Sequence, residues 1–351
     1  MKKSLCFFVT LFCWSIQVSV GQVVKYADDF LDLGGFSSLK SLGGAGLSYI
    51  DGCEAAWGNP SMPNNRYNRM DFAMMHGVVA ESMASRSMAS AMCRLDSMLS
   101  ATVSLLRVGV DDIQNTINLY DSNGNIDYSN ISFFSVADYA AYISICRLLR
   151  RVPYWSVGGS LKLLYRREGP FAQAYGFGLD IAATYRRRRF AVSAVLRDAT
   201  TTFCFWSVNE EEFGNEYIAT GNSIPEEGLE QRAPSLALSV AQSFRYNRFD
   251  FTCMAAFYCF FGGDTHYLLH SKQISADPSF GFETKFADVI SIRIGISSLQ
   301  RAQQLTLSHT TSARGSFGAG LALYGFRLDY AIEFGGALGL KSNMFTIGWG
   351  R

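Results

Sequence analysis

The stretch VISIRIGISS, residues 289–298, decides which fold this chain adopts. Isoleucine stands at every second position from Ile290 to Ile296. The polar or small residues in the alternate positions are Ser291, Arg293, Gly295 and Ser297. A period of two predicts a β-strand with one apolar face and one polar face. In a soluble sheet Arg293 would face solvent, whereas in a membrane barrel the isoleucines would face lipid and Arg293 a polar interior.

The same alternation returns along the chain from Met70 onward. We expect about fourteen strands, which start near residues 70, 86, 98, 136, 153, 171, 188, 233, 248, 277, 289, 314, 325 and 341. Most have about the 9 to 11 residues that a tilted strand needs to cross a bilayer. Strands of soluble proteins are usually about 5 to 6 residues long. The strand lengths therefore favour a transmembrane antiparallel β-barrel.

The connections between these strands alternate in length. Short ones lie near residues 95, 150, 186, 246, 287 and 324, and long ones at about 108–135, 199–232, 262–276 and 299–313. Aromatic residues flank the short connections: Tyr154, Trp155, Tyr185, Phe190, Phe244, Phe249, Phe286, Tyr324 and Phe326. Short periplasmic turns, longer external loops and aromatic girdles are typical of outer-membrane barrels.

Charged residues recur on the polar face of the strands. Those expected to face the lumen are Lys162, Asp180, Glu283, Lys285, Arg293, Arg327, Asp329 and Glu333. The opposite phase would turn the basic residues toward lipid, where each costs about 2 to 4 kcal/mol. We therefore expect a charged interior. Two roles stay open for these side chains: they neutralise one another across a narrow lumen, or they guide a cargo's head group or hold a plug.

The beginning of the chain does not alternate. In MKKSLCFFVTLFCWSIQVSVGQ two lysines precede an apolar run and small residues follow, which predicts a secretory signal peptide over residues 1–21. Residues 22–69 combine a short helical start with glycine-rich chain. We expect them to form a plug inside a barrel of residues 70–351, with a periplasmic tether as the alternative.

Other chemistry finds little support in the sequence. A net charge of +1 gives no indication of nucleic-acid binding. No nucleophile, base and orienting acid come together, so we expect no enzymatic activity, no cofactor and no metal. Asp121 to Asp127 resembles the start of a calcium loop, but Ser132 stands where a glutamate is expected. His266 and His270 lack the glutamate of a zinc-protease pattern.

The cysteines beyond the signal peptide are Cys53, Cys93, Cys146, Cys204, Cys253 and Cys259. No pair has the spacing of metal ligands. We interpret most of them as small hydrophobic residues, and disulfides among them stay open.

The segment FLDLGGFSSLKSLGGAGLSYIDGCEAAWGNPS, residues 30–61, resembles the opening of PorV/PorQ-type outer-membrane proteins, relatives of the FadL long-chain fatty-acid transporters. The residues that carry this likeness are Gly43, Gly44, Gly46, Trp57, Asn59 and Pro60. Ser61 departs from the usual alanine, and Gly58 is inserted before Asn59. Familial stretches recur at residues 107–116, 161–167, 176–186, 196–207 and 326–340, so the likeness spans nearly the whole mature chain.

The resemblance implies a fourteen-stranded barrel in the outer membrane of a diderm bacterium, surrounded by lipid, with its N-terminal segment folded inside. PorV and PorQ are associated with type IX protein secretion. We therefore expect first a non-enzymatic secretion component, whose partners are secretion-system proteins and secreted cargo. The alternative is a FadL-like channel for long-chain fatty acids or other hydrophobic small molecules, which would release them sideways or through a kink in the wall.

Overall fold

The computed structural model describes residues 28–62, 69–116, 119, 124–209, 228–261, 267–303, 309–336 and 339–350 of the 351-residue chain. The predicted signal peptide, His266 and Asp121 lie outside these ranges. No helix in the described ranges has the length and apolar character needed to cross a lipid bilayer.

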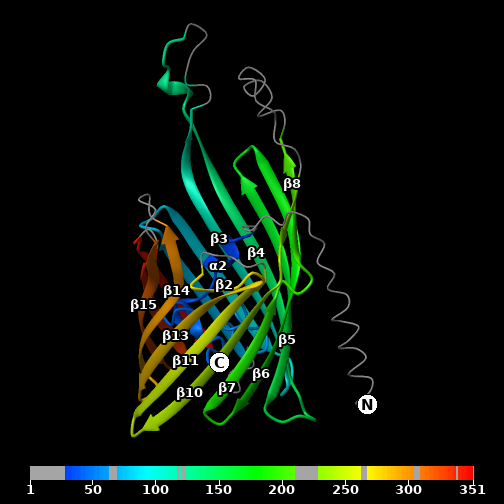
Figure 1. Ribbon diagram of the computed structural model, residues 1–351, viewed down its shortest axis with the longest axis vertical. Helices are drawn as coiled ribbons and strands as arrows, with labels where there is room; N and C mark the ends of the chain where they lie inside the picture. Colours follow the sequence, from blue (N-terminus) through cyan, green and yellow to red (C-terminus); the bar gives the residue numbers. More distant parts are fainter. Residues whose placement is uncertain are drawn as a thin grey trace.

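Fourteen antiparallel strands of the described chain close into a barrel (Figure 1), which confirms the predicted all-β architecture. The ring consists of β1 (Met70–Val79), β2 (Ala84–Arg94), β3 (Leu99–Asn115), β4 (Ser132–Leu148), β5 (Trp155–Glu168), β6 (Ala172–Arg187), β7 (Phe190–Arg197), β10 (Ser235–Tyr246), β11 (Phe249–Phe261), β13 (Ile274–Phe286), β14 (Ile290–Gln303), β15 (His309–Leu323), β16 (Phe326–Gly335) and β17 (Ser342–Gly350). Pairing of β17 with β1 closes it. The short strands β8 (Thr202–Val208), β9 (Leu229–Arg232) and β12 (Leu269–His270) extend the wall.

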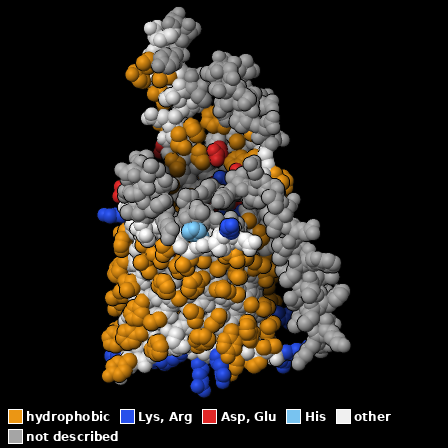
Figure 2. Space-filling model, viewed as in Figure 1, with side chains coloured by type: hydrophobic (Ala, Val, Ile, Leu, Met, Phe, Trp, Pro, Cys, Tyr) orange, Lys and Arg blue, Asp and Glu red, His pale blue; other side chains and the backbone are white. Residues whose placement is uncertain are grey.

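The two faces of β14 differ in exposure in the way that a membrane barrel requires. Ile292 and Ile294 are each 51% exposed on the outer face, whereas Ser291 and Arg293 are 6% and 7% exposed on the inner face. Hydrophobic side chains cover the outer wall as a belt, and Lys and Arg side chains lie below it (Figure 2). The outer surface is therefore suited to lipid.

The two ends of the barrel differ in their connections. Tight turns such as 188–189, 247–248 and 324–325 lie at what we call the short-turn end, at the bottom of Figure 1. The β3–β4 hairpin, which carries the 3₁₀ helix η2 (Tyr128–Asn130), rises far above the opposite, long-loop end. The predicted alternation is not complete, because connections 80–83 and 169–171 at the long-loop end are also short.

The wall is interrupted between β7 and β8. β6 pairs with β7 up to Ile181 and Leu196, and with β8 from Phe177 and Phe203 onward. On the side of β6, residues 197–202 are thus opposed only by 178–180, and the surplus chain folds inward with Asp198 at φ 53°. The sequence predicted a single long loop over residues 199–232, whereas β8 and β9 continue the wall within it.

Candidate functional site

Residues 28–62, which we call the plug, lie inside the barrel. They form three short helices, α2 (Phe30–Leu33), α3 (Ser37–Lys40) and η1 (Ala45–Ser48). Hydrogen bonds tie the plug to strands all around the ring: Ser37 to Thr346 (2.7 Å), the Ser41 carbonyl to Ser316 (3.0 Å), Ser48 to Ser239 (3.0 Å) and Ser61 to Thr184 (2.7 Å). The described plug therefore contacts the wall on several sides.

Glycines in the wall allow this close approach. A Cβ atom added at Gly295 would lie 2.3 Å from the backbone of Leu42 and Gly43, and one at Gly158 would lie 2.1 Å from the Pro60 carbonyl oxygen. Such distances exclude any side chain. The plug backbone packs directly on the strand backbone at these points.

The family-like residues of the plug occupy its turns and its contacts with the wall. Gly43 and Gly44 have φ angles of 62° and 80°, which glycine adopts at little cost. Tyr258 donates a hydrogen bond to the Gly44 carbonyl at 2.7 Å. Asn59 donates to the Leu47 carbonyl at 2.8 Å and so closes the plug on itself.

One sector of the inner wall is apolar. Buried side chains of β1–β5, β16 and β17 pack against Phe30, Phe36 and Trp57 of the plug. They are Met75, Met88, Met92, Leu106, Val108, Ala140, Tyr142, Leu164, Ala331 and Met344, which we call the methionine sector. The charged interior expected from the sequence is sparse here, with Asp71 of β1 and Arg86 of β2 buried among mostly apolar side chains.

The opposite sector carries most of the predicted lumen charges. Arg293 of β14 contacts Glu283 of β13 (2.5 Å) and Asp329 of β16, and Lys285 lies 3.2 Å from Glu283. Arg327 of β16 joins the wall to the plug, at 3.2 Å from Glu54, and it also pairs with Asp71 of β1 at 2.7 Å.

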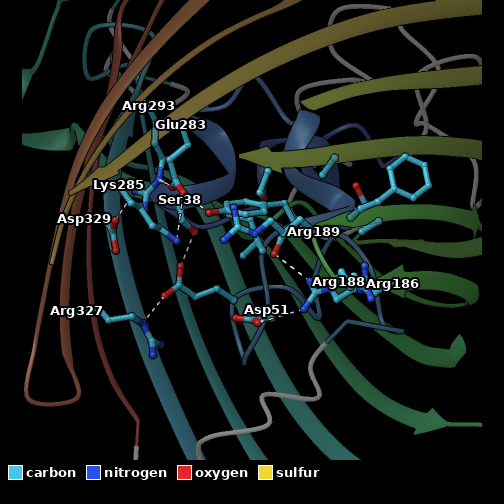
Figure 3. A pocket seen from close by; sticks show the side chains of 18 residues that line it. Ser38, Asp51, Arg186, Arg188, Arg189, Glu283, Lys285, Arg293, Arg327 and Asp329 are labelled. Carbon is cyan, nitrogen blue, oxygen red and sulfur yellow. Dashed lines mark hydrogen bonds and ion pairs between the residues drawn. The ribbon is translucent and has the colours of Figure 1, made fainter. Parts of the chain in front are cut away.

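A cavity of about 390 Å³ lies between this charged sector and the plug, near the short-turn end. Figure 3 shows Arg186, Arg188 and Arg189 on one side of it and the side chains of β13, β14 and β16 on the other. Arg186 donates to the Tyr49 carbonyl at 3.1 Å and approaches Asp51 at 3.5 Å. The cavity is therefore polar and basic.

The remaining predicted charges lie elsewhere. Lys162 of β5 contacts Asp180 at 2.9 Å and also Asp198 of the wall interruption. Arg232 extends this group, at 3.3 Å from Asp198 and 2.7 Å from Asp32 of the plug. Glu333 pairs separately with the buried Arg86 at 2.9 Å.

Sequence reasoning missed Arg86, Asp198, Arg232, Asp32 and Glu54. The alternation of β2 places Arg86 on the same face as Met88, a signal that was available. Asp198 follows the regular strand, Arg232 lies in an expected loop, and Asp32 and Glu54 lie in the plug. No periodicity assigns a face to these four.

Burial shifts the pKa values of two plug groups. Burial raises the pKa of Glu54, while Arg327 acts in the opposite direction. Burial lowers the pKa of Lys40 to about 8, and the positive charge of Arg86 adds to this effect while Glu333 opposes it.

The other candidate sites of the sequence are not assembled in the described ranges. Asp127 accepts hydrogen bonds from the backbone N–H and hydroxyl of Ser129 (3.0 and 2.6 Å). His270 lies in hydrogen-bonding contact with the Tyr267 carbonyl. No three His, Cys, Asp or Glu side chains are grouped as metal ligands among the residues described. The six cysteines named above are all free thiols.

No protein-family model matches the sequence, and no curated protein has a matching sequence. Solved structures match in fold. The CymD monoaromatic hydrocarbon channel superposes with a TM-score of 0.57 at 12% identity, over 90% of this chain and 96% of that one. For the toluene transporter TbuX of Ralstonia pickettii the values are 0.56, 13%, 90% and 98%. For a FadL homologue of Pseudomonas aeruginosa they are 0.52, 9%, 90% and 97%.

At these identities the likeness establishes the fold alone. The chain has the barrel architecture of FadL-type transporters over nearly its whole length. The finer resemblance to PorV and PorQ gains no support from these matches.

Proposed function

We propose that this chain is an outer-membrane channel for small hydrophobic molecules in a diderm bacterium. This is the alternative reading of the sequence, and it replaces secretion as the first hypothesis. The apolar belt supports placement in a membrane, and the tight turns support a periplasmic position for the short-turn end. The structural neighbours include a monoaromatic hydrocarbon channel and a toluene transporter.

The methionine sector is the observation that carries the proposal. Barrel interiors are usually polar, yet here Met75, Met88, Met92 and Met344 lie on the inner face. Methionine is unbranched and fills spaces of changing shape. A hydrophobic molecule that enters between the methionine sector and the plug replaces apolar contacts between them by its own apolar contacts with both. It stays out of water in doing so.

Polar contacts hold the plug on both sides, and the methionine side adds apolar packing. On the charged side, Arg327 and Glu54 fix it through directional contacts. On the methionine side, packing is joined by hydrogen bonds. Arg86 donates to the Leu33 carbonyl at 2.8 Å, Ser90 donates to the Cys53 carbonyl at 2.9 Å, and the Cys53 N–H donates to Asp71 at 2.9 Å. We infer that a path along the methionine sector opens by local exchange of apolar contacts, while these hydrogen bonds and the lumen charges keep the plug anchored.

Uptake by cells provides the test. A strain without this gene should take up labelled toluene or long-chain fatty acid more slowly, while uptake of a hydrophilic sugar and export of C-terminally tagged proteins stay normal. Reintroduction of the gene should restore uptake. Normal uptake together with lost export would overturn the proposal in favour of secretion.

A matched pair of variants links uptake to the sector. Met75→Gln with Met92→Gln places amides on the path and should slow uptake of the apolar solute. Met75→Leu with Met92→Leu conserves volume and apolarity and should preserve it. Equal uptake by both variants, at equal amounts of folded barrel, would show that the transported molecule does not pass along the methionine sector.

A further inference from the structure

The short-turn end carries a one-sided group of exposed arginines. Five of them come from the ends of β4 and β6 and the turns that follow: Arg147, Arg150, Arg151, Arg187 and Arg188, which we call the arginine collar. All five are exposed. Within the described part of the chain none of them forms an ion pair with a carboxylate, so their positive charge is not neutralised by those residues.

The surrounding charges sharpen this asymmetry. At the β10–β11 turn, Arg245 is paired with Asp250 and lies 3.4 Å from Asp288. Beside the collar, Asp51 is paired with Arg186 at 3.5 Å, and Asp96 of the β2–β3 turn is an exposed carboxylate that offsets one positive charge. The surplus of positive charge is thus concentrated over β4 to β7.

The collar continues the lipid-facing rows of the wall. On β4 the outward side chains Ile143 and Ile145 are 45% and 53% exposed, and Arg147 is the next residue in that row. On β6 the outward Tyr185 is followed by Arg187 in the same way. Arg147 and Arg187 therefore point sideways from the barrel, whereas Arg188 also borders the cavity at the mouth.

Aromatic rings beside the collar indicate its depth in the membrane. Trp155 and Tyr185 pack with ring centroids 5.5 Å apart, and the guanidinium of Arg187 lies 5.5 Å from the centre of the Tyr154 ring. Aromatic side chains collect at the level of lipid head groups. Arginine side chains above apolar surface extend toward that level and bind phosphate through several N–H groups.

We propose that the arginine collar binds the head groups of anionic phospholipids in the membrane leaflet at the short-turn end. Each basic residue near an anionic surface adds to the attraction, and five unpaired residues on one side form a local site rather than a uniform ring. The proposal rests on the membrane placement given under Proposed function, but not on transport.

Lipid retention measures this preference directly. The mature full-length chain is reconstituted into mixed vesicles of phosphatidylethanolamine and phosphatidylglycerol, extracted in mild detergent, and its bound lipids are identified by native mass spectrometry. We expect the wild type to retain phosphatidylglycerol at about fivefold enrichment over the vesicle composition. The variant with all five arginines changed to Gln should lose that enrichment, and the variant with five lysines should keep most of it.

Matched controls separate this inference from the proposed function. Arg245→Gln with Arg248→Gln removes charge from the same end and should leave the enrichment unchanged. Heat-modifiable gel migration reports insertion of every variant, so a folding failure is recognised. If the five-Gln variant does not insert, the wild type is measured at low and high salt instead. Added salt screens the arginine charges, so it should reduce the phosphatidylglycerol enrichment of the wild type.

Two results would overturn the proposal. One is a wild type whose bound lipids mirror the vesicle composition, as expected if the collar binds an acidic protein instead. The other is an inserted five-Gln variant that still retains phosphatidylglycerol. Normal hydrophobe uptake by the strain without this gene, together with the expected lipid enrichment, would count against the channel only.

Discussion

Trp57 of the plug stacks on Tyr142 of β4, with ring centroids 4.0 Å apart and an interplanar angle of 18°. Both rings are buried, at 7% and 4% exposure. The contact joins the family-like end of the plug to the methionine sector. A residue that carries the sequence resemblance therefore packs directly on the part of the lumen in which we place the hydrophobic path.

Trp57→Ala should loosen the plug without opening the barrel. Removal of a buried aromatic side chain costs about 3 to 5 kcal/mol, and here the loss falls on plug packing. Limited proteolysis of the folded barrel should cleave the plug faster in the variant. Trp155→Ala, at an exposed position on the outer wall, is the control. Equal cleavage of both variants would argue against Trp57 as an anchor.

Ile292→Arg should impair insertion into bilayers. Ile292 is on the outer face, where an arginine side chain that faces lipid near the bilayer midplane costs about 2 to 4 kcal/mol. Arg293→Gln leaves that face unchanged, so its barrel should still insert, although Glu283 and Asp329 lose their partner. The yield of heat-modifiable barrel in vesicles compares the two. An insertion defect of the same size in both would contradict the assigned faces.

Arg232→Gln should release the N-terminal part of the plug. Arg232 joins Asp198 of the wall to Asp32 of the plug and donates to the Asp28 carbonyl at 2.7 Å. Asp32 is half exposed and Asp198 keeps its contact with Lys162, so the loss should be about 1.5 to 3 kcal/mol, as for hydrogen bonds to charged groups. The loss should appear as a lower midpoint of urea unfolding.

Arg245→Gln is the matched control for this change, because its ion pair lies at the exposed short-turn end. Exposed pairs contribute about 0 to 1 kcal/mol, so its midpoint should stay near the wild-type value. If the Arg232 variant shifted no more than this control, the bridge between wall and plug would have no energetic role.

Stability should rise with pH in the alkaline range because of Lys40. Its pKa is about 8 in the folded chain, below the ordinary value of 10.5. Between these values the unfolded chain binds more protons than the folded chain, so the free energy of unfolding increases with pH.

Lys40→Met isolates that contribution. The wild type should gain stability relative to this variant as pH rises through the window, as measured by urea midpoints at matched pH. A difference between the two that stays constant with pH would show that burial of Lys40 does not shift its titration.

The sequence by itself determined the barrel. Alternation is a local property, since each residue's face follows from that of its neighbours, and a slip by one residue would turn Arg293 and Ile292 to the wrong sides. Strand length then separated a membrane wall from a soluble sheet. The approximate strand starts of the ring could be predicted for the same reason. The interruption at Asp198, where the period fails, and the short strands β8, β9 and β12 were missed.

The tertiary structure decided what fills the barrel and what holds it. Ser37 meets Thr346 across 309 positions of sequence, and Arg327 meets Glu54 across 273. No local pattern specifies such pairs, because they exist only after the ring has closed around the plug. The methionine sector was hidden for a related reason. Apolar residues on both faces of β1 to β3 weaken the alternation, and only the packing of Phe36 and Trp57 shows which methionines face inward.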